Sequence, residues 1–311
     1  MRTAQLIEYG SAEGFGMKEL PVPEPGAGEV LLAVEACGLN PIDVWMRSGH
    51  LRERLPRPLP TVLGWDVAGT VAAIGPGVNG LSAGDGVLTL LDFAVEGANA
   101  EYVVVTADRV VARPPSVTAA QAAALPCAGL TGAQLVERGL ELTPGGSVLV
   151  TGAVGAVGRA AVHAALHAGL RVVAAVRQAH RMAAEQLGGV ELLVTDVPSE
   201  RLVEPVDAVI DTAGPEVVAP LLPLVRRGGT VLTVVPLPLP EADAAQQLTL
   251  QRFAVTFDRD RLAELIGEVA VGTLSMPVAA CYDLADLGAA HRRLEAGGLD
   301  GKIVLTMERA E

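Results

Sequence analysis

The sequence predicts an α/β fold with a β-rich first part and a doubly wound parallel sheet in the middle. Half of the 311 residues are hydrophobic but only 3% are aromatic, which suits buried parallel strands under alanine-rich helices. In the first 120 residues, glycine and proline separate short apolar runs, as in an all-β barrel or sandwich. From residue 121 onward, strand-like runs alternate with helical patterns, as in a parallel sheet covered by helices.

The first part of the chain, residues 1–120, is expected to form the β-rich domain. Its apolar runs are short, and turn signals such as Pro25-Gly26 and Gly75-Pro76-Gly77 lie between them. The strand candidates are Ala4–Tyr9, Val30–Ala36, Val67–Ile74, Val87–Leu91 and Tyr102–Val105.

The second part, residues 121–272, is expected to form the parallel sheet. Its strand candidates are Ser147–Val150, Arg171–Val176, Leu192–Val194, Ala208–Asp211 and Thr230–Val235. The segment between Gly189 and Asp211 is short, so we expect an abbreviated crossover helix there.

The last part, residues 273–311, combines one helix with one strand. A helical pattern runs over Leu284–Glu295 and stops at Gly297 and Gly298. An apolar strand, Lys302–Thr306, follows and is expected to be buried.

The turn after the strand Ser147–Val150 has the spacing of a dinucleotide-binding loop. Three glycines occur at intervals of three residues, and a helical run over Arg159–Ala168 follows directly. The first glycine permits a sharp turn, the second lets the backbone approach a pyrophosphate, and the third lets helix and strand pack closely. The helix N-terminus presents free N–H groups to the anion. The candidate cofactor-binding residues are Gly152, Ala153, Val154, Gly155, Ala156, Val157 and Gly158.

The end of the next strand distinguishes between the two nicotinamide dinucleotides. A glycine-rich turn alone also occurs for structural reasons, so this second position supplies needed support. An NAD-binding fold places an acidic residue here for the ribose 2′-hydroxyl, whereas this chain has Arg177 and Arg181, with His180 between them. A guanidinium binds a 2′-phosphate through two parallel hydrogen bonds. We therefore expect NADPH as the cofactor; the alternative is that both arginines belong to a solvated helix start.

The composition excludes several classes of partner. A formal net charge of −13 disfavours nucleic acid and anionic membrane surfaces, which both require clustered cations. Cys37, Cys127 and Cys281 are far apart and odd in number, so neither a CxxC metal site nor a disulfide framework is indicated. The first residues lack a signal-peptide pattern, and no apolar run is long enough to span a membrane. We therefore expect a cytoplasmic protein.

Seven segments, taken in order, make the chain resemble a known family. They are Gly38–Asp43, Arg47–Gly49, Leu63–Gly69, Ala124–Thr131, Val150–Gly158, Ala290–Gly297 and Gly301–Leu305. The chain resembles the zinc-free quinone oxidoreductases, a zeta-crystallin-like group of the medium-chain dehydrogenase/reductase superfamily. The resemblance implies a GroES-like substrate domain over 1–120, a Rossmann domain over 121–272 and a return to the substrate domain over 273–311. It also implies a homodimer that transfers hydride from NADPH to a quinone or an apolar, activated alkene.

The same resemblance bears on metal binding. Zinc alcohol dehydrogenases of the superfamily bind a catalytic zinc through Cys, His and Cys, and the matching places here hold Asn40, Trp65 and, nearby, Cys127. One thiol does not supply the three protein ligands that a catalytic zinc needs, so no metal is expected. His163 and His167 share one helix face, but no third ligand is apparent beside them, and a structural role is favoured.

Two residues near the vacant zinc place, Asn40 and Trp45, are the catalytic candidates. Hydride transfer requires a hydrogen-bond donor for the negative charge that develops on the substrate oxygen, and the Asn40 amide is a candidate donor. Trp45 stands where related reductases often have Tyr, and its indole N–H donates a hydrogen bond but no proton of useful acidity. Asp43 and Asp66 are expected to order the loop. His50 is interpreted as a solvated loop residue, with proton donation as the alternative.

Three further residues are expected to contact the cofactor. By the resemblance, Thr131 lines the nicotinamide ring. Ala213 and Val235 stand at the carboxyl ends of sheet strands, where ligands bind in such folds. Asp211 is expected to cap the turn before Ala213.

Two alternative functions remain open. An enoyl-thioester reductase acting on a carrier-bound acyl chain would use a basic patch, and Arg52, Arg54 and Arg57 form a short basic run. A non-catalytic NADPH-binding sensor would need the glycine loop and no catalytic residue.

Overall fold

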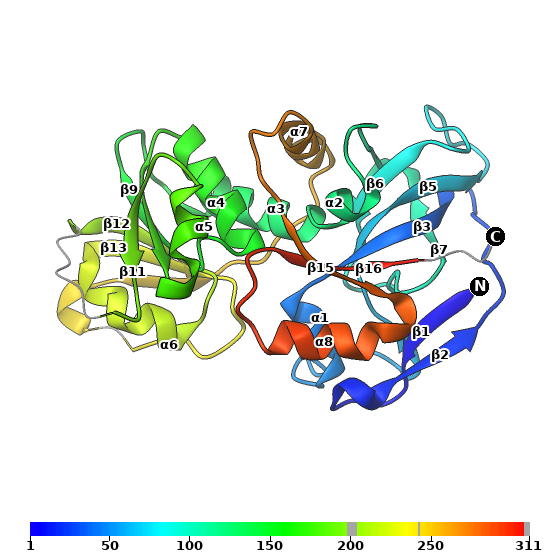
Figure 1. Cartoon of the computed structure of the whole chain (residues 1–311), viewed down its shortest axis with the longest axis horizontal. Coiled ribbons are helices and arrows are strands. Elements are labelled where there is room, and N and C mark those ends of the chain that lie inside the picture. The colour runs from blue at the N-terminus through cyan, green and yellow to red at the C-terminus, as the bar shows by residue number, and fades with distance from the viewer. Residues whose placement is uncertain (198–203, 242, 308–311) are drawn as a thin grey trace. The chain divides into compact units, whose positions relative to one another are not determined.

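The computed structural model describes residues 1–197, 204–241 and 243–307 (Figure 1). The chain forms two compact units, one made of Met1–Cys127 with Phe257–Glu311 and the other of Ala128–Thr256. Within the described ranges, no helix combines the length and the apolar character needed to cross a lipid bilayer.

The first unit contains a large mixed sheet and a small antiparallel one. The large sheet has seven strands in the described residues: β15-β16-β3-β5-β6-β8 in order, with β7 paired to β3; the small sheet has the order β2-β1-β4. The strands are β1 (Arg2–Leu6), β2 (Phe15–Glu19), β3 (Glu29–Leu39), β4 (Thr61–Val62), β5 (Asp66–Ile74), β6 (Gly86–Leu90), β7 (Tyr102–Thr106), β8 (Val111–Ala112), β15 (Val278–Asp283) and β16 (Lys302–Thr306). The helices are α1 (Pro41–Arg47), α2 (Ala119–Ala123), α7 (Arg259–Ala270) and α8 (Leu287–Glu295).

Strand β3 positions the polar site of this unit because β5, β7 and β16 all pair with it. Ile303 of β16 lies opposite Leu39, and Asp66 of β5 lies opposite Gly38. Nine residues of β3 are buried, with only Glu29 and Glu35 partly exposed, as expected for an apolar run between paired strands. The register therefore brings the first residues of β5 and β16 to the same end of β3.

The compact units divide the chain at Cys127 and Thr256, whereas the sequence suggested residues 120 and 272. Helix α2 packs against β3 and β5, and so stays with the first unit. Helix α7 belongs there as well, since the Arg259 Nε donates to the Val110 carbonyl at 3.1 Å.

Several predicted bounds in the first unit shift by one to three residues, and two of the shifts have a clear hydrogen-bonding cause. The strand predicted over Ala4–Tyr9 ends at Leu6, because the Ile7 amide donates to the Gly14 carbonyl at 2.8 Å as the chain turns into β2. The helix predicted over Leu284–Glu295 begins with a 3₁₀ turn at Leu284–Asp286, where the Asp283 carboxylate accepts from the Ala285 amide.

The second unit is a doubly wound parallel sheet, which confirms the predicted fold class. Its strands lie in the order β11-β10-β9-β12-β13-β14, and each pair is parallel. The strands are β9 (Ser147–Thr151), β10 (Arg171–Val176), β11 (Val190–Val194), β12 (Val206–Asp211), β13 (Val225–Thr233) and β14 (Thr249–Arg252). The helices are α3 (Pro126–Gln134), α4 (Ala156–His167), α5 (Arg181–Glu185) and α6 (Pro215–Val218). Strand order reverses between β9 and β12, and ligands of such sheets bind at the carboxyl ends beside that reversal.

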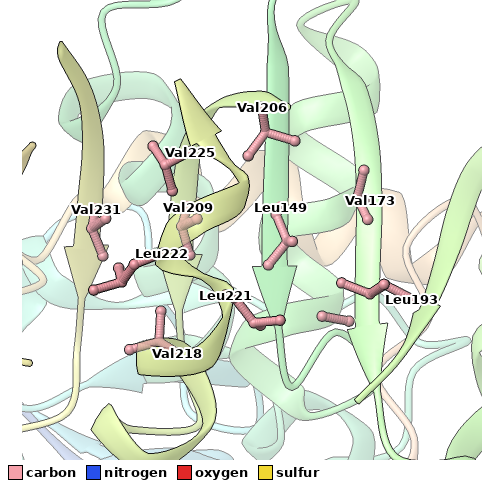
Figure 2. Close-up of a cluster of buried hydrophobic side chains, with 11 residues drawn as sticks. Leu149, Val173, Leu193, Val206, Val209, Val218, Leu221, Leu222, Val225 and Val231 are labelled. Carbon is pink, nitrogen blue, oxygen red and sulfur yellow. The ribbon is translucent and has the colours of Figure 1, made fainter. Parts of the chain in front are cut away.

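One face of this sheet is covered by the segment that follows β12. Leu149, Val173 and Val209 project from neighbouring strands toward Val218 and Leu221, and all five side chains are buried (Figure 2). Burial of aliphatic side chains on this scale fixes the sheet, because each contributes about 1.5–3 kcal/mol relative to exposure.

Two predicted boundaries in the second unit shift near the glycine loop and the end of β13, and a third prediction lies outside the described residues. Helix α4 begins at Ala156 rather than Arg159, so its first turn lies inside the glycine loop. Strand β13 begins at Val225 and ends at Thr233, which leaves Val235 beyond the strand. The abbreviated helix expected between Gly189 and Asp211 falls on residues 198–203, outside the described residues.

Candidate functional site

The glycine loop of the second unit requires glycine at two of its three positions for steric reasons. Gly152 adopts φ of 60°, and a Cβ there would lie 2.6 Å from the Thr212 hydroxyl. A Cβ at Gly158 would lie 2.2 Å from the Gly152 carbonyl oxygen, so only glycine lets α4 pack against the turn. At Gly155 a Cβ would meet only the Gly152 carbonyl, at 3.2 Å, and otherwise faces open space. No side chain therefore covers the backbone at Gly155, where a phosphate would approach.

The N-terminus of α4 is open to an anion. Gly155 is its N-cap residue and supplies no side-chain hydrogen bond to the first turn. The free N–H groups and the helix dipole together favour a phosphate there. Arg159, whose role the sequence did not indicate, is buried in this turn and its Nε donates to the Val154 carbonyl at 2.8 Å. This bond holds the loop against the helix that follows it.

The carboxyl ends of β9, β12 and β13 are joined through one buried carboxylate, Asp211. Its Oδ1 accepts from the Thr151 hydroxyl at 2.7 Å and the Gly214 amide at 2.9 Å, and its Oδ2 accepts from the Thr233 hydroxyl at 2.7 Å. The Ala213 amide donates to the same carboxylate at 3.1 Å. Asp211 thus caps the turn after β12, and this turn presents the exposed Ala213 beside the glycine loop.

Two further cofactor candidates lie at the borders of this arrangement. Val235 is partly buried just past β13, and its amide donates to the Thr233 hydroxyl at 3.0 Å. Thr131 is buried in α3. A Cβ at the neighbouring Gly132 would lie 2.5 Å from the Val157 carbonyl, so α3 packs tightly on the first turn of α4.

The arginines at the end of β10 are exposed, as binding of a 2′-phosphate requires. The Arg177 Nη2 lies 3.2 Å from the His180 Nε2, and the Arg181 Nε donates to Glu185 at 3.0 Å. An acidic residue that the sequence did not indicate, Asp196, also lies here and accepts from the Gln178 amide at 2.7 Å.

His163 and His167 are in ring contact on α4, with centroids 4.2 Å apart and ring planes tilted by 48°. The described part of the chain contains no group of three or more His, Cys, Asp or Glu side chains arranged to bind a metal ion. Within those residues, His163 and His167 share a helix face without forming part of such a group.

A buried polar cluster lies in the first unit at the end of β3. The Asn40 Nδ2 donates to the Asp66 Oδ2 at 2.9 Å, and the Lys302 Nζ donates to the same oxygen at 2.9 Å. Lys302 also donates to the Asn40 Oδ1. The Asp66 Oδ1 accepts from the Cys127 amide at 2.6 Å, and the Asp43 Oδ2 accepts from the Asn40 amide at 2.7 Å.

The charges of this cluster influence one another because water is excluded. The side chains of Lys302 and Asp66 are 5% and 0% exposed. Burial acts to lower the pKa of Lys302, but the negative groups around it, Asp66 foremost, together raise the pKa above its ordinary value. Burial, together with the Asp66 charge, raises the pKa of Asp43 to about 7. Burial also raises the pKa of the Cys37 thiol.

The cluster does not fit a catalytic zinc. Asn40 is held by Asp66 and by the Lys302 ammonium, which places a cation where a second cation would be repelled. Trp65 is fully buried beside Phe93 and is not a metal ligand. Of the three positions that match zinc ligands in related alcohol dehydrogenases, Cys127 alone offers a thiol. A catalytic zinc needs three protein ligands.

The structure separates Trp45 and His50 from the buried cluster's hydrogen bonds. Trp45 is partly buried on α1, and its carbonyl accepts from the Ser48 hydroxyl at 3.2 Å. His50 is exposed, with its Nδ1 2.6 Å from the Ser48 Oγ. Asp43 and Asp66 do order the start of α1, as expected, but Asp66 also pairs with Lys302, which was not among the sequence candidates. Its signal was a lysine at the first position of an apolar strand, in a chain with few lysines.

Three family models match segments of the chain. An alcohol dehydrogenase GroES-like domain matches residues 26–115, and a zinc-binding dehydrogenase domain matches residues 189–305. The model of an NAD dependent epimerase/dehydratase family matches residues 148–225, which include the glycine loop.

Whole-chain comparisons give the same relationship. The chloroplastic quinone-oxidoreductase QR1 of Triphysaria versicolor is 32% identical over 98% of each chain. The chloroplastic NADPH-dependent alkenal/one oxidoreductase of Arabidopsis thaliana is 29% identical over 98% of this chain and 79% of its own length. A crystal structure of an NAD-dependent alcohol dehydrogenase has a TM-score of 0.88 at 30% identity, covering 99% of this chain and 100% of its own.

The order of domains, the parallel sheet with its glycine loop and the full-length similarity lead to one assignment. The chain is an oxidoreductase that belongs to the quinone oxidoreductase group of the medium-chain dehydrogenase/reductase superfamily.

Proposed function

We propose that the protein is an NADPH-dependent reductase that transfers hydride, without a metal, to a quinone or an α,β-unsaturated carbonyl. The observation that carries the proposal is the cluster of Asn40, Asp66 and Lys302, which supplies hydrogen-bond donors where zinc relatives bind their metal. Hydride addition to a conjugated carbonyl spreads the new charge over an enolate or a phenolate. Hydrogen-bond donors stabilise such an anion, so a Lewis acid is not required.

The second unit would hold the cofactor by its backbone. The glycine loop and the N-terminus of α4 would bind the pyrophosphate, and Thr131, Ala213 and Val235 would border the nicotinamide ring. The nicotinamide supplies the hydride. The protein's part is to orient that ring, and the Asp211 hydrogen bonds to Thr151 and Thr233 keep the strand ends rigid enough to do so.

The choice of NADPH over NADH rests on Arg177 and Arg181. Both are exposed at the end of β10, and neither is held in a buried ion pair. The similarity to an enzyme named as NADPH-dependent supports the choice, whereas a structural relative is named as NAD-dependent. Asp196 beside the Gln178 amide is the residue that would favour a free 2′-hydroxyl, so the cofactor must be tested directly.

The test is NADPH oxidation, followed in the nicotinamide band at roughly 340 nm, with quinones, enones and enoyl thioesters as acceptors. EDTA is present throughout, and NADH replaces NADPH in a parallel series. We expect turnover of quinones or enones with NADPH and no loss with EDTA. Loss of activity with EDTA that added zinc restores would contradict the metal-free mechanism.

The enoyl-thioester alternative has weaker structural support. Of its basic run, Arg57 donates to the Phe93 carbonyl and lies over the Trp65 ring at 5.9 Å. It is therefore engaged within the protein rather than free to bind an acidic carrier. Preferential turnover of enoyl thioesters in the same acceptor series would reverse this ranking, and tight NADPH binding without any turnover would favour the sensor.

The proposal includes a cytoplasmic homodimer. Light scattering of the purified protein measures the mass directly and is compared with the 31.9 kDa of one chain. A mass of a single chain would contradict the dimer.

A further inference from the structure

Lys302 is a buried cation, and it is a lysine in a chain whose other cations, one lysine apart, are arginines. The sequence has two lysines, Lys18 and Lys302, among 23 lysines and arginines in total. Lys18 is exposed on β2, whereas the side chain of Lys302 is 5% exposed. Arginine carries nearly every other positive charge, so a buried lysine indicates a place that suits a compact ammonium rather than a planar guanidinium.

The hydrogen bonds of the cluster leave one donor of Lys302 unused. An ammonium group has three N–H donors. One donates to the Asp66 Oδ2 at 2.9 Å and another to the Asn40 Oδ1. Among the residues that the structure describes, none accepts the third.

The other polar groups of the cluster are poorer donors to a substrate oxygen. The Asn40 Nδ2 already donates to Asp66 at 2.9 Å and to the Gly38 carbonyl at 3.4 Å. When it is ionised, the Asp66 carboxylate can only accept hydrogen bonds and cannot donate one. The Trp65 indole N–H has no hydrogen-bond partner among the described residues, but its side chain is fully buried beside Phe93.

We propose that Lys302 is a catalytic residue whose third N–H donates to the carbonyl oxygen of the reducible substrate. This inference rests on the proposed function and deepens it, because it names the group that recognises the oxygen of a quinone or enone. The Asn40 and Asp66 side chains then act as positioning residues, since their two hydrogen bonds fix the direction of the remaining one.

The electron and proton balance of the step is simple. The cofactor, when bound, would supply a hydride that forms a new C–H bond at the β-carbon of the enone, and the cofactor would be oxidised in return. The C=C electron pair then moves toward the carbonyl, and an enolate oxygen forms opposite the ammonium. Lys302 stabilises this oxyanion by a hydrogen bond and keeps its proton, because the Asp66 carboxylate raises the pKa of the ammonium. A proton from solvent adds to the α-carbon and completes the reduction.

The first experiment separates this role from mere neutralisation of Asp66. The double variant Lys302→Met/Asp66→Asn removes both charges together, so neither is left buried alone. We expect it to keep its melting temperature and NADPH affinity but to lose about 10²-fold in kcat for an enone. Lys18→Met is the matched control and is expected to match the wild type. A double variant with wild-type kcat would overturn the proposal.

The second experiment uses the wild-type protein and does not depend on turnover. Labelling lysine with ¹³C and ¹⁵N gives two side-chain signals, because the chain has two lysines. A saturated cyclic ketone, added with NADP⁺, is a substrate-like probe that cannot be reduced at a C=C bond. We expect the Lys302 signal to shift and the Lys18 signal to stay unchanged.

The outcomes distinguish the inference from the proposed function. Absence of NADPH turnover with every quinone and enone refutes the proposed function, while a ketone-dependent shift of the Lys302 signal still supports carbonyl recognition. Competitive inhibition of enone reduction by the ketone, with no shift of the Lys302 signal, refutes the role of Lys302 alone.

Discussion

The glycine loop of the second unit and the polar cluster of the first unit are assembled in opposite ways. The loop uses consecutive residues, Gly152–Gly158, and offers backbone N–H groups at a helix N-terminus. The cluster joins Asn40 to Asp66 over 26 positions and Asp66 to Lys302 over 236. A site made from backbone depends on local chain conformation, whereas a site made from buried charges depends on strand register. The two should therefore fail in different ways when mutated.

The largest expected effect comes from removing the carboxylate that balances the buried Lys302 charge. Asp66→Ala leaves the Lys302 ammonium buried without its carboxylate, and we expect a loss of about 3–5 kcal/mol in the free energy of unfolding. Asp211→Ala in the second unit removes a carboxylate that accepts hydrogen bonds from hydroxyls and amides, and should cost less, about 1–3 kcal/mol. Urea denaturation of both variants measures the difference. Equal losses would mean that the charge of Lys302 matters little to stability.

The next effect contrasts two glycines of the same loop. In Gly158→Ala the new Cβ would lie 2.2 Å from the Gly152 carbonyl, and we expect about 3 kcal/mol of destabilisation with loss of NADPH binding. In Gly155→Ala the Cβ meets one atom at 3.2 Å, so the fold should persist while NADPH affinity falls. Thermal melting and fluorescence titration with NADPH measure the two properties. Gly267→Ala, where a Cβ meets nothing within 4 Å, is the control.

A smaller effect is expected at the adenosine end of the cofactor. Arg177→Glu should weaken NADPH binding by about 2 kcal/mol, roughly 30-fold, and leave NADH nearly unchanged, because the charged hydrogen bond to the 2′-phosphate is lost. Isothermal titration with each dinucleotide measures this. Arg171→Gln, at the opposite end of β10 and paired with Glu191, is the control. Equal weakening of both dinucleotides would remove Arg177 from the 2′-phosphate site.

The last effect is the pH dependence of stability due to Asp43, which develops gradually over several pH units. Its pKa is about 7 in the folded protein against an ordinary 3.8, so the folded state holds this proton more tightly than the unfolded chain. The stabilisation is complete below pH 3.8 and is lost as the pH rises toward about 7, by at most about 1.4 kcal/mol per pH unit.

Asp43→Asn isolates this contribution. Asp66, Lys302 and Cys37 are the charged or titratable groups around Asp43, and they remain in the variant. The melting temperature of the wild type should therefore fall more steeply than that of the variant between pH 4 and pH 7. Parallel profiles would show that Asp43 titrates near its ordinary pKa when folded.

Strongly patterned elements were predictable from the sequence. The strands Arg171–Val176 and Lys302–Thr306 have the predicted bounds, because turn residues enclose each apolar run. Element ends set by a hydrogen bond were less predictable. The first strand stops at Leu6 because of a bond to Gly14, and α4 starts three residues early because Gly155 is its N-cap.

The sequence by itself determined the α/β class, the order of the two architectures, the glycine loop and the arginines that follow β10. Each depends on residues that are near neighbours in the chain, where periodicity and glycine spacing act directly. Only the tertiary structure decided that Asp211 joins three strand ends, and that Asn40, Asp66 and Lys302 form one buried cluster. Those contacts arise from the pairing of β3 with β5 and β16, and strand register is a property of the packed sheet rather than of any one segment.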